Sequence, residues 1–274
     1  HQLFLYPRES QVVRADSFEI ETLPESKTRW VRDCYENIVL RVDYGLNKAE
    51  LLEFKSVIRV RLRDSNPFDF ILDPHALAFP MRYHQHEQLA LSPYLCSTPQ
   101  PGASKALDWF YTAVKNPNQA DNIVSFLSEI NQAVFESIAY ERRDEEGIQT
   151  PDETLAKHTG SCRDMAVLMI AVVRQLGLAA RFVSGYLYDP PSDEDGEHIF
   201  NRAHGSMHAW LEIYLPGAGW KGFDPTNGIL ANHFFIPTAV ASDPVHANPI
   251  QGRYYHDEQV PSHMEIELNI EEIK

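Results

Sequence analysis

The first 95 residues alternate between apolar and polar positions in the way typical of β-strands. Within residues 56–62, Val57, Arg59 and Arg61 alternate with Ile58, Val60 and Leu62, which is the period of a half-buried strand. Apolar runs at 38–42 and 68–72 predict further strands. Because no long helical period occurs before residue 100, we interpret residues 1–98 as a small all-β, sandwich-like domain.

The pattern changes after a run of turn-forming residues at 97–102. From residue 123, apolar residues recur every three or four positions, which predicts an amphipathic helix that Tyr140 closes. Its expected buried stripe consists of Ile123, Phe126, Leu127, Ile130, Val134 and Ile138. Because a second helix and several strands follow, we expect a second domain over residues 99–274 and a chain that is α+β as a whole.

The second predicted helix carries the first candidate for chemistry, Cys162. Ser161 and Asp164 have the spacing of a capping box, and Gly177 stands where helices commonly end in a left-handed residue. Cys162 is therefore predicted at the N-terminus of a buried helix. Free N–H groups there favour a thiolate and can serve as an oxyanion hole. A cysteine can equally be a small buried hydrophobe, so its position alone leaves both interpretations open.

A predicted hairpin brings a histidine and a carboxylate together. His208 leads a strand of period two, a glycine-rich turn follows, and a second strand ends at Asp224. With a three-residue loop, Leu215 faces Gly219 and Asp224 faces Trp210, which puts Asp224 diagonal to His208 on one face. A slip of one residue would move Asp224 to the other face. This register predicts a hydrogen bond between the histidine and the carboxylate.

Cys162, His208 and Asp224 then have the roles of a nucleophile, a base and a residue that orients the base. Each has an ordinary structural explanation when it is taken alone: a buried thiol, a strand histidine and a turn-forming aspartate before Pro225. The combination of a helix-terminal cysteine, a strand histidine and a strand-end aspartate, in that order, is what favours a catalytic group.

Residues 103–230 resemble the transglutaminase-like superfamily, and specifically its bacterial branch of transglutaminase-like enzymes and cysteine proteases. The matching segments are Gly160-Ser161-Cys162-Arg163-Asp164, 180–186, His208-Ala209-Trp210, 219–227 and 150–155. The resemblance implies that Cys162, His208 and Asp224 form a catalytic triad. It also implies a papain-like core, in which a buried helix with the cysteine at its N-terminus packs on an antiparallel sheet.

Residues 1–95 resemble, less strongly, the β-rich N-terminal region of these bacterial enzymes, with Asp33 and Asn37 at a turn motif of that region. No segment resembles the calcium sites or the two C-terminal β-barrels of animal transglutaminases. The resemblance therefore does not imply activation by calcium.

The predicted function is that of a cysteine acyl-transfer enzyme that forms a thioester with a peptide, protein or amide substrate. Water as the acceptor makes it a protease or amidase, which the resemblance favours, whereas an amine acceptor makes it a transglutaminase. The alternative from another class is a non-catalytic binding or scaffold protein with the same fold. Tyr186, Trp210 and His204 are the predicted substrate-binding residues.

Charge and composition narrow the range of partners. The chain has 24 Lys and Arg against 39 Asp and Glu, a formal charge of −15, which argues against a nucleic-acid partner. The longest apolar run, at 165–173, is about half of the roughly 20 residues that span a bilayer. The histidines, including His84, His86 and His204, lack the spacing of a zinc motif, so we expect neither a metal nor a cofactor.

The cysteines and one acidic segment complete the predictions. Cys34, Cys96 and Cys162 are odd in number and far apart, which indicates a reducing compartment such as the cytoplasm. The first residue is His1 rather than Met, so the lack of a signal peptide carries little weight. The acidic run at 189–197 is interpreted as a solvated loop that could also cover the cleft. The sequence leaves the oligomeric state open.

Overall fold

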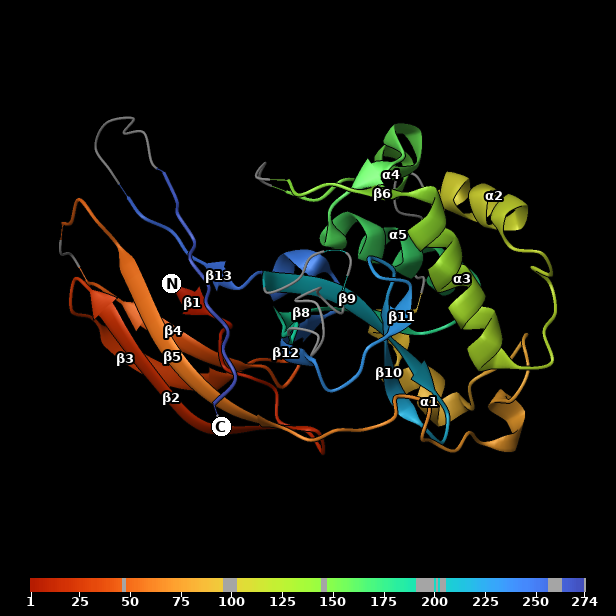
Figure 1. Ribbon diagram of the computed structural model, residues 1–274, viewed down its shortest axis with the longest axis horizontal. Helices are drawn as coiled ribbons and strands as arrows, with labels where there is room; N and C mark the ends of the chain where they lie inside the picture. Colours follow the sequence, from red (N-terminus) through yellow and green to blue (C-terminus); the bar gives the residue numbers. More distant parts are fainter. Residues whose placement is uncertain are drawn as a thin grey trace.

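The computed structural model describes residues 1–45, 48–95, 103–143, 147–190, 200, 202, 206–255 and 263–273. Figure 1 shows a β-rich layer structure at one end and a sheet covered by helices at the other. The predicted α+β class is confirmed.

The β-rich end consists of a four-stranded sheet and a two-stranded ribbon. The sheet has the order β13-β1-β4-β3, and the ribbon pairs β2 with β5. Side chains from both layers share one apolar cluster, in which Leu40 and Val42 of the sheet meet Phe18 and Phe54 of the ribbon. The strands are β1 (Gln2–Leu3), β2 (Val13–Leu23), β3 (Lys27–Arg32), β4 (Ile38–Asp43), β5 (Glu53–Leu62) and β13 (Ile250–Gln251).

The strands predicted at 38–42 and 56–62 are present as β4 and β5, but the strand predicted at 68–72 is wrong. There the chain turns, because the N–H groups of Phe68 and Asp69 donate to Asn66 at 3.0 Å each. Phe68 is 56% exposed. An apolar run next to an asparagine that bonds its own backbone favours a turn over a strand.

The second sheet supports the candidate site. It is five-stranded, with the order β11-β10-β9-β8-β12, and neighbouring strands are antiparallel. The hairpin register is the predicted one, since Leu215 pairs with Gly219 and Leu211 pairs with Phe223. The strands are β8 (Ala180–Leu187), β9 (Ser206–Leu215), β10 (Gly219–Asp224), β11 (Ile229–Leu230) and β12 (Phe235–Ala241).

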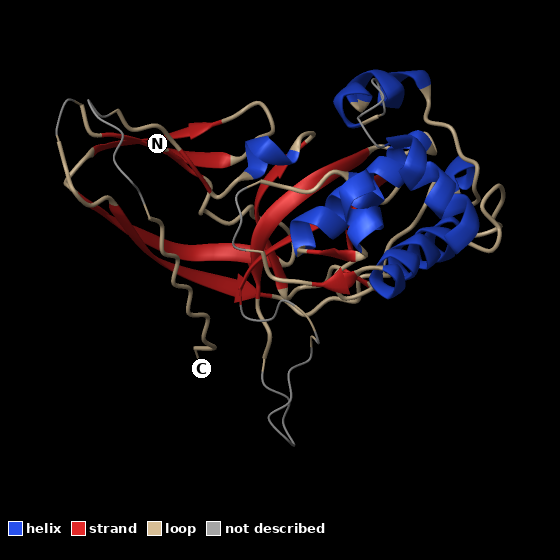
Figure 2. Ribbon diagram, turned by 90° about the horizontal axis from the view of Figure 1, so that it is seen from above, coloured by secondary structure: helices blue, strands red, loops and turns tan. Residues whose placement is uncertain are grey.

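Helix α5 (Cys162–Gln175) packs against β8 and β9 on one side and is covered by α2, α3 and α4 on the others. Figure 2 shows the helices gathered at one end of the molecule. Because neighbours surround α5, its side chains are apolar nearly all round. The covering helices are α2 (Ala103–Ala113), α3 (Ile123–Ser137) and α4 (Pro151–Lys157). The remaining short helices are α1 (Gln85–Ala90), η1 (Pro74–Ala76), η2 (Ser92–Tyr94) and η3 (Pro244–Ala247).

The predicted helix after residue 122 is confirmed as α3, but it does not end at Tyr140. It ends at Ser137, and β6 (Ala139–Tyr140) then pairs in parallel with β7 (Thr159–Gly160). The helix begins where predicted because Asn122 caps it, accepting a hydrogen bond from the N–H of Ser125 at 2.9 Å.

A strand pair and hydrogen bonds join the two ends of the molecule, in addition to the chain itself. Strand β13 comes from near the C-terminus and pairs with β1, Leu3 opposite Ile250. The fully buried Asn37 exchanges hydrogen bonds with the backbone of Val240 on β12, at 2.8 and 2.9 Å. The linker predicted at 97–102 lies outside the described residues, and the division at residue 98 stays a prediction.

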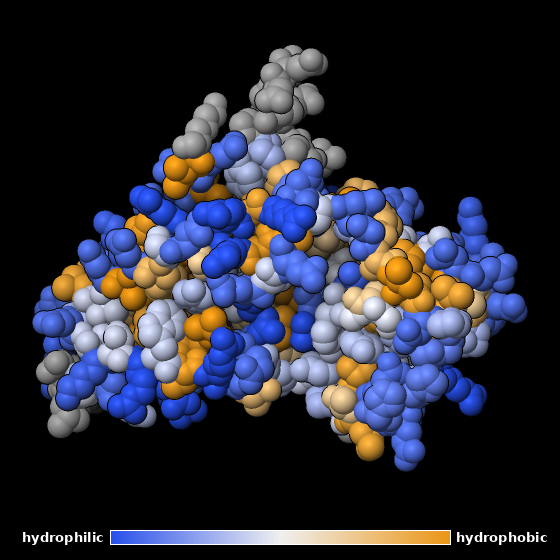
Figure 3. Space-filling model, turned by 90° about the horizontal axis from the view of Figure 1, so that it is seen from below, coloured by the Kyte–Doolittle hydropathy of each residue, from blue (hydrophilic) through white to orange (hydrophobic). Residues whose placement is uncertain are grey.

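The surface in Figure 3 carries apolar side chains in separate patches among hydrophilic ones. Among the residues that the structure describes, none of the helices is long and apolar enough to span a membrane.

Candidate active site

Cys162 is the first residue of α5, as predicted. Ser161 before it is extended, with φ −78° and ψ 173°, and the helix ends before Gly177, whose φ is +82°. Met165, Leu168 and Met169 of the same helix are fully buried. Because the core holds the helix, the partly exposed Cys162 has a defined position at a helix N-terminus.

His208 and Asp224 form the predicted hydrogen bond. His208 Nε2 lies 3.0 Å from Asp224 Oδ2, and both side chains are completely shielded from solvent. The bond follows from the hairpin register, which brings the end of β10 beside the start of β9. The other ring nitrogen, Nδ1, is buried and makes no hydrogen bond within the described part of the chain.

The surroundings of His208 change its basicity. Burial alone lowers the pKa of His208, but the Asp224 carboxylate and the Cys162 thiol raise it, and the net result is a pKa of about 10. Asp224 and Cys162 thus both favour the protonated imidazole at neutral pH. A histidine so placed can hold a proton next to a thiolate.

Three donors hold the Asp224 carboxylate. Besides His208, the side-chain amide of Asn227 donates to Oδ2 at 2.7 Å, and the N–H of Thr226 donates to Oδ1 at 2.9 Å. Asn227 in turn accepts the N–H of Arg202 at 3.2 Å. These contacts orient the carboxylate toward the histidine. Asn227 belongs to the motif noticed in the sequence, but the sequence did not indicate that it contacts Asp224.

Tyr140 is a residue of the site that the sequence interpretation missed. It lies opposite Gly160 in the β6–β7 pair, and the next N–H, that of Glu141, donates to the Gly160 carbonyl at 2.9 Å. Burial raises the pKa of Tyr140, and the charges of Cys162 and Asp224 raise it further. Its phenol therefore stays neutral within electrostatic reach of both residues. A two-residue parallel strand has no local sequence signal that could have identified it.

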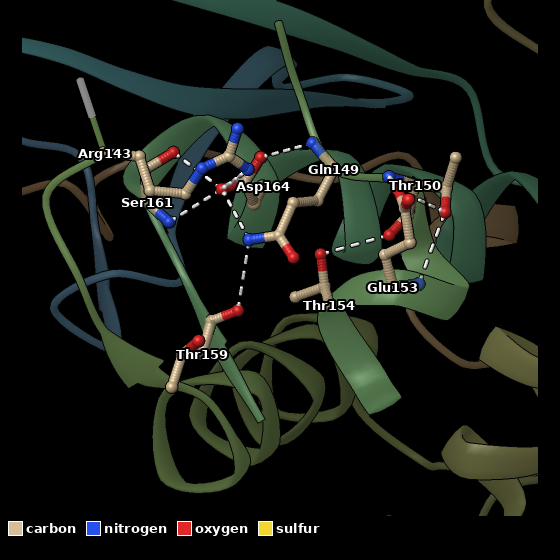
Figure 4. Close-up of polar contacts among 8 residues, drawn as sticks. All are labelled: Arg143, Gln149, Thr150, Glu153, Thr154, Thr159, Ser161 and Asp164. Atoms are coloured by element: carbon tan, nitrogen blue, oxygen red, sulfur yellow. Dashed lines mark hydrogen bonds and ion pairs between the residues drawn. The ribbon is translucent and has the colours of Figure 1, made fainter. Parts of the chain in front are cut away.

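The capping residues of α5 and α4 appear together in Figure 4. Asp164 accepts hydrogen bonds from the N–H and the hydroxyl of Ser161, each at 2.8 Å, so the predicted capping box is confirmed. Thr150 and Glu153 form a second capping box at the start of α4. Both helices that frame the nucleophile thus have fixed N-termini.

The predicted substrate-binding residues lie in different surroundings. Trp210 is only 2% exposed and packs against Phe235 and alongside His208, with ring centroids 5.3 and 6.1 Å apart. The Tyr186 hydroxyl donates to the carbonyl of Leu5 at 3.3 Å. His204 lies outside the described residues, as does most of the acidic run at 189–197. A role of these residues in substrate binding stays a prediction.

Among the described residues, no group of three or more His, Cys, Asp or Glu side chains is arranged to hold a metal ion. Cys34 is exposed and Cys162 is partly exposed, and both are free thiols; Cys96 lies outside the described residues.

Residues 112–225 match the family model of the transglutaminase-like superfamily. An uncharacterized protein of Mycobacterium leprae (strain TN) is 31% identical over 102 residues, 37% of this chain and 34% of that protein. An uncharacterized protein of Mycobacterium tuberculosis (strain ATCC 25618 / H37Rv) is 32% identical over 139 residues, 48% of this chain and 43% of that protein. The chain spans less than half the length of these curated relatives.

A solved structure shares the fold. It is that of a "Putative Cysteine Protease" from Cytophaga hutchinsonii, with a TM-score of 0.65 and 17% sequence identity. The match covers 90% of this chain and 78% of that chain, so it includes most of the β-rich end as well as the helical end. At this identity the similarity shows the fold alone.

Proposed function

Because residues 112–225 form a domain of the transglutaminase-like superfamily, whose members are generally cysteine-dependent enzymes, we propose that this protein is a cysteine acyl-transfer enzyme that hydrolyses peptide or amide bonds. The observation that carries the proposal is the juxtaposition of Cys162, at a helix N-terminus, with the buried His208–Asp224 pair.

In the first half-reaction, the Cys162 thiolate attacks the carbonyl carbon of the scissile amide. Backbone N–H groups at the start of α5 donate hydrogen bonds to the carbonyl oxygen and stabilise the negative charge that develops on it. The C–N bond then breaks while His208 transfers its proton from Nδ1 to the leaving amine, which leaves a thioester on Cys162. Asp224 holds Nε2 throughout and stabilises the imidazolium.

In the second half-reaction, His208 Nδ1 takes a proton from a water molecule as the water oxygen attacks the thioester. The C–S bond breaks, the carboxylic acid product leaves, and the thiolate is restored beside a protonated imidazole. The pKa of His208, raised to about 10, favours this resting ion pair at neutral pH.

The name of the C. hutchinsonii protein supports hydrolysis as the outcome, and water has access to any open thioester. Transfer to an amine shares the first half-reaction and differs only in the second nucleophile.

The test measures both outcomes on one enzyme. Wild-type protein is incubated with a fluorogenic peptide library, and in parallel with casein plus a fluorescent primary amine. We expect peptide cleavage without amine incorporation, and no turnover by Cys162→Ala. Cys34→Ala is the matched control and should keep full activity, because Cys34 is exposed and outside the proposed site.

Amine incorporation without cleavage would show that the activity is that of a transglutaminase and not of a hydrolase. Turnover that survives Cys162→Ala would overturn the proposal. An inert protein in which Cys162 alkylates no faster than Cys34 at neutral pH would instead indicate a binding or scaffold protein.

A further inference from the structure

The Asp164 carboxylate makes more contacts than a helix cap requires. It is completely buried and accepts hydrogen bonds from Ser161, from the N–H of Gln149 at 2.7 Å and from the side-chain amide of Gln149 at 3.3 Å. Arg143 Nη1 lies 3.1 Å from Oδ2, with its side chain only 12% exposed. Three separate segments therefore converge on one carboxylate two residues after the nucleophile (Figure 4).

The neighbouring helix provides an internal comparison. Glu153 occupies the same capping position in α4, but its carboxylate is exposed and accepts hydrogen bonds from Thr150 alone, at 2.8 and 2.9 Å, in the described part of the chain. Capping by itself thus needs neither burial nor a hydrogen bond from an arginine, although the charge of Arg143 is among those that act on Glu153. The additional partners of Asp164 require a different explanation.

Electrostatics supplies that explanation. A residue two positions along a helix is displaced by about 3 Å along the axis, so the Asp164 carboxylate lies in the same first turn as Cys162. A buried negative charge in the same helical turn opposes the formation of a thiolate, because little water screens it. The guanidinium of Arg143 supplies the opposite charge at hydrogen-bond distance.

Other titratable groups near the nucleophile are the same in all variants of Arg143 and Asp164. His208 from β9 and Tyr140 from β6 interact electrostatically with Cys162. Asp224 from β10 acts on both of them, Arg142 acts on Tyr140, and Glu153 of α4 interacts with Arg143. Arg143 is the arginine whose hydrogen bond to Asp164 is drawn in Figure 4.

We propose that Arg143 is a positioning residue for the nucleophile, which neutralises Asp164 so that this carboxylate can order the start of α5 without opposing the Cys162 thiolate. The inference rests on the proposed function. The pair also ties the segment that follows Tyr140 to the helix N-terminus, and thereby holds one wall of the site in place.

The test is the pH dependence of Cys162 alkylation by iodoacetamide, followed by peptide mass spectrometry. In Arg143→Met the carboxylate loses its counter-charge, so we expect the pH midpoint of alkylation to rise by about one unit and the alkylation rate at pH values below the midpoint to fall about tenfold. Arg143→Lys should stay near the wild-type midpoint. The double variant Arg143→Met/Asp164→Asn should return to it, because both charges leave together.

Glu153→Gln is the control, since it removes the charge of the other capping box and should leave the midpoint unchanged. A folded Arg143→Met with the wild-type profile would overturn the inference, as would a double variant no different from Arg143→Met. If Arg143→Met does not fold, shifted midpoints in both Arg143→Lys and the double variant would overturn it equally. His208→Ala, measured alongside, tests the proposed function separately, since an unchanged Cys162 reactivity there would defeat that function rather than the role of Arg143.

Discussion

Each side chain of the site contacts the next one in a series that begins beside Cys162. His208 carries a proton and is hydrogen-bonded to Asp224. Asp224 in turn accepts hydrogen bonds from Asn227 and from the N–H of Thr226. All of the carboxylate oxygens in this chain of contacts are buried, so each lost bond leaves a polar group without water to replace its partner.

Asn227 is expected to matter through Asp224. Asn227→Ala removes a 2.7 Å hydrogen bond to the oxygen that also contacts His208. Bonds to charged groups contribute about 1.5–3 kcal/mol, so Cys162 alkylation at neutral pH should slow about tenfold, and an NMR titration should find a lower pKa for His208. Asn232→Ala, which alters a turn by removing one side-chain bond to the N–H of Phe234, is the control. Equal behaviour of the two variants would contradict this prediction.

The raised pKa of His208 also predicts how stability depends on pH. The folded protein holds this proton up to a pKa of about 10, whereas an unfolded histidine releases it near 6.5. The contribution to stability is therefore complete below pH 6.5 and is lost as the pH rises toward 10. Urea unfolding from pH 6 to 10 should show the free energy of unfolding falling with pH.

His208→Gln should remove this part of the slope, while His86→Gln, at an exposed position of α1, should keep it. A wild-type curve parallel to that of His208→Gln would show that the histidine does not hold its proton.

At the scale of the elements, close approach of the backbones of β8 and β12 sets the shape of the sheet that carries His208. Gly185 faces Pro237 at the point where the register of this strand pair shifts. A Cβ at Gly185 would overlap the carbonyl oxygen of Ile236. The strand needs a glycine there because a side chain would push the edge strand away.

Gly185→Ala should therefore lower the free energy of unfolding by about 1–3 kcal/mol, the range for overpacked sites, or prevent folding. Gly177→Ala is the matched comparison, because a Cβ there meets no atom within 4 Å and only the positive φ of +82° opposes it, which costs about 1–2 kcal/mol. Urea denaturation of both variants measures the two changes in the free energy of unfolding. A Gly185→Ala protein as stable as Gly177→Ala would contradict the prediction.

The element scale also separates what local patterns predict from what they do not. The start of α5, the start of α3 and the hairpin register were predicted correctly, because each depends on residues within a few positions or on a turn of known length. The strand at 68–72 and the helix end at Tyr140 were wrong. At 68–72, hydrogen bonds to Asn66 make the chain turn although the segment is apolar. At Tyr140, the chain leaves the helix because it forms a strand pair with residues some 20 positions away.

At the scale of the whole molecule, the two ends share one hydrophobic core. Phe4 and Val39 from the β-rich end belong to the same buried cluster as Met165 and Leu211 near the site. Asn37 links the two ends by hydrogen bonds. Its amide contacts both the N–H and the carbonyl of Val240 and also accepts a hydrogen bond from Arg8 at 2.6 Å. The β-rich end is thus positioned to support the sheet that carries His208.

Asn37→Ala should destabilise the whole protein, because it leaves the buried backbone groups of Val240 without partners. With about 1–3 kcal/mol for each unsatisfied group, we expect a loss of about 3 kcal/mol in urea denaturation. Tyr35→Phe removes only the contact between the Tyr35 hydroxyl and Ser242, 2.9 Å long and partly buried, and should lose about 1 kcal/mol. A smaller loss of unfolding free energy in Asn37→Ala than in Tyr35→Phe would contradict the prediction that Asn37 links the two ends.

The sequence by itself determined the elements that carry Cys162, His208 and Asp224, because helix caps, strand alternation and hairpin length act over short stretches of chain. Only the tertiary structure decided what surrounds those residues. The burial of Asp164 with Arg143, the placement of Tyr140 beside Gly160, the shielding of Trp210 and the return of β13 to the first sheet all join residues far apart in the chain. Local periodicity does not specify such pairs, since they depend on how whole elements pack.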